Sequence, residues 1–305
     1  MTDLLRAPPE ERSAAELLSF GVVNLDKPAG PSAHQVAGWV RDLTAEAVAD
    51  LDPDMPPVDR AAHAGTLDPK VTGCLPMLLG DATRMAQVFL EGRKEYVSVL
   101  ELHAHAPTNL ESVLDEFEAP LYQKPPRKSA VSRRLRVREI HELELLDLTD
   151  RQALIRMQCE SGTYVRKLCH DLGLALGTGA HMGHLRRTAT DPFDDSSLVN
   201  LQSFTDALTF ATEDGYEDLL REIVQPAERA LRHLPSVEIA PSAAREVATG
   251  APVYAPGVIS ADSEIDDGAL VACYTPDESA VCLGTMVGDP DAESGTVVDL
   301  ERVLV

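Results

Sequence analysis

A short apolar run followed by a helical pattern opens the chain. Residues 20–25 are mostly apolar and lead into a turn rich in Pro and Gly at 26–31, which predicts a strand and then a turn. Ser32 and Gln35 have the spacing of a capping box, which marks the start of a helix. Apolar residues then recur at helical intervals at Val36, Trp39, Val40 and Leu43. Residues 45–58 are acidic, contain three prolines and are predicted to form an exposed loop.

Helical and alternating patterns continue through the middle of the chain. Asp81 can cap a helix that ends near Gly92. Strands are predicted at 97–102 and 154–159, with a helix at 112–117 between them. A further helix is predicted from apolar residues at helical spacing, namely Val165, Leu168, Cys169, Leu172 and Leu176.

The pattern changes near residue 233. The segment before it, 191–232, is acidic and mostly helical in pattern. After it come short strand-like runs separated by Gly, Pro and Asp turns, at 237–239, 270–274, 281–287 and 297–304. This predicts a small β-rich domain at the C-terminal end. The expected division is an N-terminal arm at 1–19, a large domain at 20–232 and the β-rich domain at 233–305.

Acidic residues are unevenly distributed. The formal net charge is −23, yet residues 1–167 carry 20 Lys and Arg against 26 Asp and Glu, while residues 168–305 carry 7 against 24. All six lysines lie in the first part. Many acids with few lysines and few aromatic residues are typical of adaptation to a high-salt cytoplasm. The acidity therefore indicates a halophilic source and does not by itself exclude a nucleic-acid partner.

The cysteines and the apolar content indicate the cellular compartment. The five cysteines form no Cys-x-x-Cys pair and lie mostly among apolar neighbours, so we expect reduced core thiols in a cytoplasmic protein and no metal site. The N-terminus lacks a cationic stretch followed by an apolar run. No run of apolar residues reaches the length of about 18 that a membrane-spanning helix requires. We therefore expect no export and no membrane partner.

Two cationic segments stand out against this acidic background. Residues 122–138 hold seven cations and no acid, and residues 181–188 form a smaller cationic patch with Arg186 and Arg187. A solvated loop would be the simpler interpretation, but the acidity elsewhere favours a loop that contacts phosphate groups. The cations of the larger segment are Lys124, Arg127, Lys128, Arg133, Arg134, Arg136 and Arg138.

Asp68 is the first candidate for a catalytic residue. It lies in a turn-forming segment between Gly65 and Gly73, and Pro69 restricts Asp68 to an extended conformation. A carboxylate aimed by its backbone suits a nucleophile or a base, although an Asp-Pro pair can also be an ordinary turn. Arg166 begins a helix after a strand and turn, and pairing with Asp68 would favour the ionised carboxylate.

Other catalytic patterns do not compete with this candidate. The sequence has no P-loop, no Gly-x-Gly-x-x-Gly after a strand, no Gly-x-Ser-x-Gly and no metal-ligand spacing. An ionised Asp, aromatic residues and separate basic patches fit chemistry on a nucleobase taken out of its stack. The residues alone therefore indicate an enzyme without a cofactor, with a catalytic Asp, that acts on RNA.

Four motifs in order give a family resemblance: residues 21–32, 63–73, 94–96 and 161–166. Together they resemble the motifs of TruB-type pseudouridine synthases. Residues 70–75, 125–131 and 181–188 resemble the archaeal dyskerin branch, the catalytic subunits of H/ACA guide ribonucleoproteins, and 250–258 resembles a PUA signature. The resemblance implies an α+β fold, in which a central mixed, mainly antiparallel sheet is flanked by helices, followed by a small β-barrel-like PUA domain.

The resemblance also implies roles for individual residues. Asp68 would be the nucleophile, at the sugar or at the base, and Tyr96 would pack on the flipped uracil and take part in proton removal. Arg166 would pair with Asp68, and Tyr164 and Leu185 would line the pocket. His63 and Thr66 would help to open the RNA and hold the Asp68 loop, and Lys27 and Pro28 would brace that loop. Residues 124–138 would form a mobile loop that covers the RNA, and Arg186 and Arg187 would contact RNA. The PUA domain, with Gly250 and Gly257, would bind the guide RNA.

The resemblance implies rRNA as the substrate and leaves tRNA open as a further substrate. The implied partners are an H/ACA guide RNA and accessory archaeal H/ACA proteins. The reaction requires no cofactor. A stand-alone synthase for the T-loop uridine of tRNA is one alternative, and a non-catalytic RNA scaffold is another. The sequence departs from the family in the acidity of residues 168–305, where the family usually has basic RNA-facing surfaces. If the source is halophilic, counterion release contributes less to binding in molar salt, so hydrogen bonds and stacking must contribute more.

Overall fold

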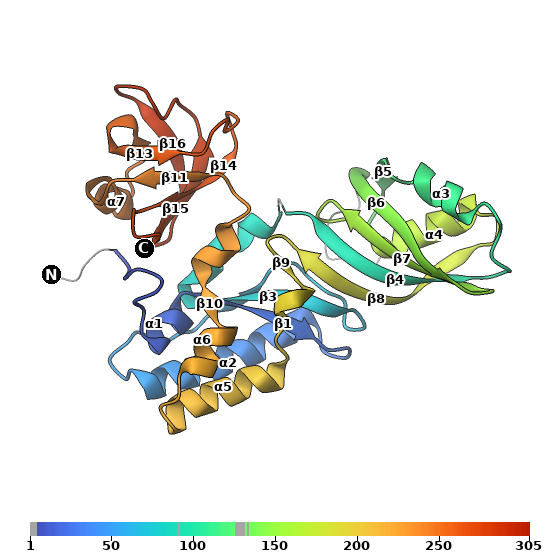
Figure 1. Ribbon diagram of the computed structural model, residues 1–305, viewed down its shortest axis with the longest axis horizontal. Helices are drawn as coiled ribbons and strands as arrows, with labels where there is room; N and C mark the ends of the chain where they lie inside the picture. Colours follow the sequence, from blue (N-terminus) through green and yellow to red (C-terminus); the bar gives the residue numbers. More distant parts are fainter. Residues whose placement is uncertain (1–4, 91, 126–131, 133) are drawn as a thin grey trace.

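The structure is a computed structural model that describes residues 5–90, 92–125, 132 and 134–305 (Figure 1). The helices are α1 (Ala14–Ser19), α2 (Ala33–Leu51), α3 (Leu110–Glu116), α4 (Val165–Ala175), α5 (Leu201–Glu213), α6 (Asp218–Ile223) and α7 (Pro241–Ala248), with 3-10 helices η1 (Gly80–Leu90), η2 (Asp195–Ser197), η3 (Ala227–Leu231) and η4 (Ala255–Gly257). Within the described residues, no helix has the length and apolar character needed to cross a membrane.

A long mixed sheet forms the first domain. Its strands run in the order β10-β1-β3-β8-β4-β7-β6-β5, with β2 added beside β3 and β9 beside β8. All neighbours are antiparallel except β3 and β8, which confirms the expected mainly antiparallel sheet. The strands are β1 (Gly21–Lys27), β2 (Ala61–His63), β3 (Thr72–Leu79), β4 (Lys94–Leu102), β5 (Pro120–Gln123), β6 (Arg136–Leu148), β7 (Gln152–Cys159), β8 (Ala180–Thr190), β9 (Phe193–Asp194) and β10 (Gln225–Pro226).

A junction with few strand pairs divides this sheet into two halves. Strands β3 and β8 share only two residue pairs, Thr72 with Arg186 and Gly73 with Arg187. Helices α1, α2 and α5 pack on the β1–β3 half, while α3 and α4 pack on the β4–β8 half, so each half has its own apolar core (Figure 1). We call the junction between β3 and β8 the seam. Strands of the two halves meet there.

The C-terminal domain is a curled six-stranded sheet. The strand order is β12-β16-β15-β14-β11-β13, so β12 and β13 are the two edges, yet only η4 separates them in the sequence. The sheet therefore curls until its edges approach, as expected for a barrel-like domain, and α7 packs on β12, β15 and β16. The strands are β11 (Ser236–Ile239), β12 (Val253–Tyr254), β13 (Val258–Ala261), β14 (Leu270–Tyr274), β15 (Ala280–Met286) and β16 (Thr296–Val303).

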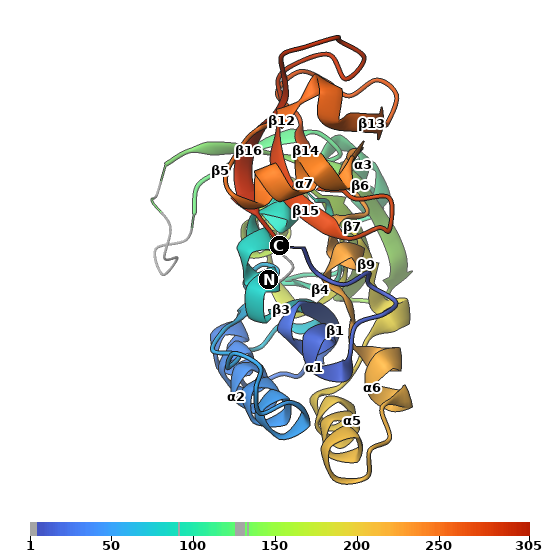
Figure 2. The ribbon, with the colours of Figure 1, turned by 90° about the vertical axis from the view of Figure 1, so that its left-hand side faces the viewer.

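One apolar cluster joins the two domains. Phe20, Met85 and Leu231 of the first domain share it with Leu283 and Leu304 of the second. Figure 2 shows the second domain at the opposite end of the molecule from α2 and α5. Burying apolar side chains from both domains in a common cluster fixes their relative position more firmly than a polar contact alone would.

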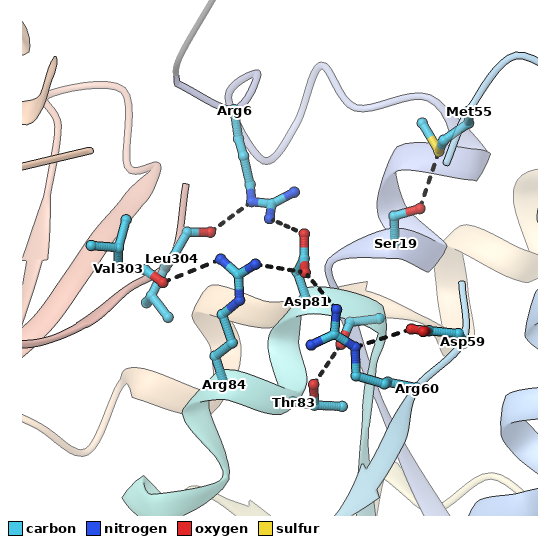
Figure 3. A network of polar contacts seen from close by, with 11 residues as sticks. Arg6, Ser19, Met55, Asp59, Arg60, Asp81, Thr83, Arg84, Val303 and Leu304 are labelled. Atoms are coloured by element: carbon cyan, nitrogen blue, oxygen red, sulfur yellow. Dashed lines mark hydrogen bonds and ion pairs between the residues drawn. The ribbon is translucent and has the colours of Figure 1, made fainter. Parts of the chain in front are cut away.

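The N-terminal segment is built into this junction. The ion pair between Arg12 and Glu228 is buried, with 2% and 10% of the side chains exposed, and Glu228 also accepts from the backbone N–H of Ala280. Arg6 donates to the Leu304 carbonyl at 2.9 Å and to Asp81 at 2.8 Å (Figure 3). The described part of 1–19 is therefore not the free arm that the sequence predicts, because Arg6 contacts the second domain, Arg12 contacts Glu228, and α1 buries its apolar residues in the core of the first domain.

Several predicted elements are confirmed, and others differ. The capping box at Ser32 and Gln35 starts α2, and all five cysteines are buried and free. The loop expected at 45–58 begins later, because α2 continues to Leu51 and buries Ala47 and Val48. The pattern also did not reveal β3, β6, β8 and α7 as elements.

Candidate active site

Asp68 lies on an exposed loop that connects β2 to β3. Gly65 and Gly73 flank the loop with φ values of +94° and +98°, a conformation that favours glycine. The Asp68 carboxylate pairs with the guanidinium of Arg166 from the first turn of α4, and both side chains are about half exposed, at 55% and 54%. The contact expected from the sequence is therefore present, in a position that a ligand from solvent can reach.

Lys27 contacts the same loop from the interior of the protein. Its side chain is buried, and its ammonium donates to the carbonyl oxygens of Pro28, Pro69 and Val71, at 2.9, 3.2 and 2.8 Å. Burial lowers the pKa of Lys27, and the negative charge of Asp68 acts in the opposite direction. These contacts tie the loop just after Asp68 to the turn at Pro28. The bracing role expected for Lys27 and Pro28 stays a prediction.

Tyr96 and Leu185 lie at the seam. They are the two partly buried apolar residues that pack against both cores of the first domain in the described structure. Strand pairing places Tyr96 opposite Arg187 and Leu185 opposite Ser98. Burial raises the pKa of Tyr96, and Arg187 works against that rise. The expected pocket residues of β4 and β8 therefore come together beside the end of the Asp68 loop.

Arg187 does not have the position predicted for it. Only 1% of it is exposed, and it donates to the carbonyl oxygens of Cys74 and Gly65 beneath the loop. The prediction that it contacts RNA is wrong, because the strand pairing of β8 turns this side chain into the protein. Arg186, its neighbour, is partly exposed and forms a two-pronged ion pair with Asp26 at 2.9 and 3.1 Å, so Asp26 already holds part of its donor capacity.

Tyr164 is positioned by a residue that the sequence did not single out. It is the cap residue of α4, and its backbone N–H donates to Oε1 of Gln123 at 2.8 Å. Gln123 is buried at the end of β5, where it faces the start of α4. No local sequence signal marks Gln123, because its partner lies 41 residues away. The end of β5 is thus anchored at the start of α4, the helix that carries Arg166.

His63 and Thr66 lie just before Asp68, where the chain leaves β2 and enters the loop. His63 ends β2 and is half-buried, and burial followed by the charge of Arg187 lowers its pKa. Its Nδ1 atom has no hydrogen-bond partner within the described residues. Thr66 is exposed, two residues before Asp68. Their expected parts in opening RNA and holding the loop stay predictions.

Of the predicted RNA contacts, Lys124 and Arg134 are exposed and Arg136 is partly exposed on β6. Arg127, Lys128 and Arg133 lie outside the described residues. In the C-terminal domain, Gly250 is exposed after α7 with φ +100°, and a Cβ there would meet nothing within 4 Å. Gly257 lies against α7, because a Cβ there would come 2.6 Å from that of Ala243.

Gly73 is required where the loop enters the sheet. A Cβ at this position would lie 2.2 Å from the backbone oxygen of Arg187, and φ is +98°. We expect Gly73→Ala to lower the free energy of unfolding by at least about 2 kcal/mol, because the seam must open and the backbone is strained. Thermal unfolding measures this. Gly30→Ala is the matched control, since φ is +118° but no atom lies within 4 Å, and an equal loss in both variants would contradict the role of the seam.

Comparison with known families covers nearly the whole chain. Residues 55–165 match the N-terminal domain of TruB family pseudouridylate synthases, and residues 166–232 match the C-terminal domain of tRNA pseudouridylate synthase B. Residues 7–37 match the DKCLD (NUC011) domain, and residues 235–304 match the PUA domain. The matches follow one another in the order of the motifs that carried the resemblance.

Similar proteins extend over the same length. A probable tRNA pseudouridine synthase B of Haloarcula marismortui is 63% identical over 99% of this chain and 94% of its own, and one of Halobacterium salinarum is 60% identical over 99% of each. A Cbf5-Nop10-Gar1 complex contains a chain with a TM-score of 0.90 and 41% identity, covering 99% of this chain and 90% of that chain. An H/ACA ribonucleoprotein bound to a substrate RNA contains one with a TM-score of 0.88 and 38% identity, covering 100% and 91%. The chain therefore belongs to the TruB family of pseudouridine synthases, in the archaeal, dyskerin-type branch with DKCLD and PUA domains and with relatives in halophiles.

Proposed function

We propose that this pseudouridine synthase isomerises uridines in RNA as the catalytic subunit of a guide RNA–protein complex, with Asp68 as its catalytic residue. The observation that carries the proposal is the Asp68–Arg166 pair, exposed on a loop that glycines and Lys27 hold in place. A carboxylate beside a guanidinium favours its charged form, which a nucleophile requires. The seam residues Tyr96 and Leu185 supply apolar surface for a base taken out of its stack.

The reaction balances without any added group. The bond between N1 of uracil and C1′ of ribose breaks, a bond between C5 and C1′ forms, the proton on C5 leaves and N1 gains a proton. Asp68 would assist by attacking either the sugar or the base, and both routes remain open. Tyr96 would pack on the detached base and take part in the removal of the C5 proton. Arg166 would hold Asp68 between turnovers.

Structural similarity supports the guide-dependent role. The chains with TM-scores of 0.90 and 0.88 come from a Cbf5-Nop10-Gar1 complex and from an H/ACA ribonucleoprotein with a substrate RNA. By similarity, this chain would bind an H/ACA guide RNA and accessory proteins of these kinds, with rRNA as substrate. Lys124 and Arg136, beside Gln123 at the end of β5, and the exposed Arg134 would contact phosphates, and the PUA domain, with Gly250 and Gly257, would hold the guide RNA. Because residues 168–305 are acidic, that grip would rely on hydrogen bonds and shape.

A stand-alone activity on tRNA is the second candidate, favoured by the name of the relatives from Haloarcula and Halobacterium, probable tRNA pseudouridine synthase B. It would use the same Asp68 chemistry. The two candidates differ in what brings the uridine to the loop, a guide RNA in one case and the fold of the tRNA in the other.

Reconstitution separates the two candidates. Purified protein is incubated in high salt with T-loop tRNA, and separately with guide RNA and an rRNA target, with and without the accessory proteins, and pseudouridine is mapped. We expect guided rRNA to be modified only in the full mixture. Modification of tRNA by the protein alone would favour the second candidate, and no pseudouridine in any arm would contradict both.

We also propose the domain division 20–232 and 233–305 and a location in the cytoplasm. The PUA match at residues 235–304 supports the boundary. Five buried, free cysteines support a reducing compartment.

A further inference from the structure

Arg187 is the largest of the fully buried side chains in the described structure, and it lies under the site. Its backbone on β8 pairs with Gly73 at the end of the Asp68 loop on one side and with Tyr96 of β4 on the other. It therefore occupies the seam itself, between the loop that carries the nucleophile and the strand that carries the aromatic residue.

The guanidinium holds both ends of the Asp68 loop. Its Nε donates to the Cys74 carbonyl at 2.7 Å, where the loop has entered β3. Its Nη2 donates to the carbonyls of Gly65 and Ala64 at 3.3 and 3.5 Å, where the loop begins. A Cβ on Gly65 would lie only 3.3 Å from Nη1, so the absence of a side chain there allows the close approach.

The charge of Arg187 is unusual for a buried group. Among the ion pairs of the described residues none includes Arg187, so its charge is met mainly by carbonyl oxygens. A buried cation without a carboxylate partner is costly, and an apolar residue would serve a merely structural position better. The charge also acts on the site, because burial raises the pKa of Tyr96 and of Cys74 and the charge of Arg187 offsets part of that rise.

We propose that Arg187 is a positioning residue, which clamps the two ends of the Asp68 loop and so fixes the carboxylate relative to Tyr96 across the seam. The inference rests on the proposed function. Its geometry needs the forked donors of a guanidinium, because Nε and Nη2 reach carbonyls at opposite ends of the loop. The single ammonium of a lysine is a point donor and cannot reproduce that fork.

The test is the Arg187→Lys variant, with Arg187→Gln as a second variant, in the full guided mixture. For Arg187→Lys we expect the single-turnover rate at saturating RNA to fall roughly 10- to 100-fold, with half-saturating RNA concentration within about threefold of wild type, because a displaced catalytic group loses rate and not binding. The matched control is Arg156→Lys on β7, whose side chain pairs in partial exposure with Glu142 and Glu144 and should keep the wild-type rate.

Each outcome decides the inference. Wild-type rates in Arg187→Lys, or an equal loss in Arg156→Lys, would overturn it. If both Arg187 variants fail to unfold cooperatively at a temperature near that of wild type, Arg187 is needed for the fold itself and the assignment to the loop is wrong. An inactive wild type, or an active Asp68→Asn variant in the same assay, would instead overturn the proposed function.

Discussion

Replacing Asp68 by Asn should reduce the single-turnover rate of pseudouridine formation by at least about 10⁴-fold, the scale of effect seen when a nucleophile is removed. Asn has nearly the same shape as Asp but cannot act as an anionic nucleophile. The side chain is about half exposed and holds no part of the core, so the fold should be retained. Mapping of pseudouridine in guided RNA over time measures the rate.

Two controls show whether the loss is chemical. Binding of guide and substrate RNA should stay within about threefold of wild type, since the amide removes a charge that phosphates would repel. Asp59→Asn serves as the matched variant, because Asp59 is a mostly exposed surface residue paired with Arg60. A rate near wild type in Asp68→Asn would refute the assignment of Asp68.

Replacing Arg12 by Met should lower the free energy of unfolding by about 3–5 kcal/mol. The ion pair with Glu228 is buried, so removing Arg12 leaves a carboxylate in the interior without its partner. Glu228 also receives the Ala280 N–H from the second domain, so the loss should loosen the junction between the domains. Denaturant unfolding in high salt, followed by a probe in each domain, measures the effect.

The double variant isolates the cause. Adding Glu228→Gln to Arg12→Met removes the stranded charge and should recover part of the loss, which a double-mutant cycle quantifies. Arg41→Met is the control, because its pair with Asp42 is exposed and should contribute less than about 1 kcal/mol. A change of that small size for Arg12→Met would show that the junction does not depend on this pair.

Much of the fold follows from local signals. The capping box at Ser32 and Gln35, the alternation at 154–159 and the punctuated short runs after Pro235 each depend on residues close in sequence. Strand β3 does not stand out in the sequence because Pro76 interrupts its pattern, although residues 73–78 of the strand pair with β1. The length of α2 was underestimated because burial of Ala47 and Val48 against the core outweighs the acidic residues around them.

Some residues of the site could also be predicted from local signals, and others could not. Asp68, Tyr96 and Arg166 carry recognisable motifs, so they could be chosen from the sequence. The sequence could not show that Arg187 is buried while Arg186 is partly exposed. Adjacent residues of a strand face opposite sides, and only the pairing of β8 with β3 and β4 decides which side is buried. The role of Gln123 could not be predicted for a related reason, because the residue it contacts is distant in the chain.

The contact between Arg6 and the Leu304 carbonyl has a consequence for how the chain is made. During synthesis Arg6 leaves the ribosome long before Leu304 exists, and Arg12 long before Glu228. The segment that emerges early therefore cannot complete its contacts until the second domain has been made. Until the second domain has been translated, the apolar cluster around Phe20 lacks the side chains of Leu283 and Leu304 that complete it.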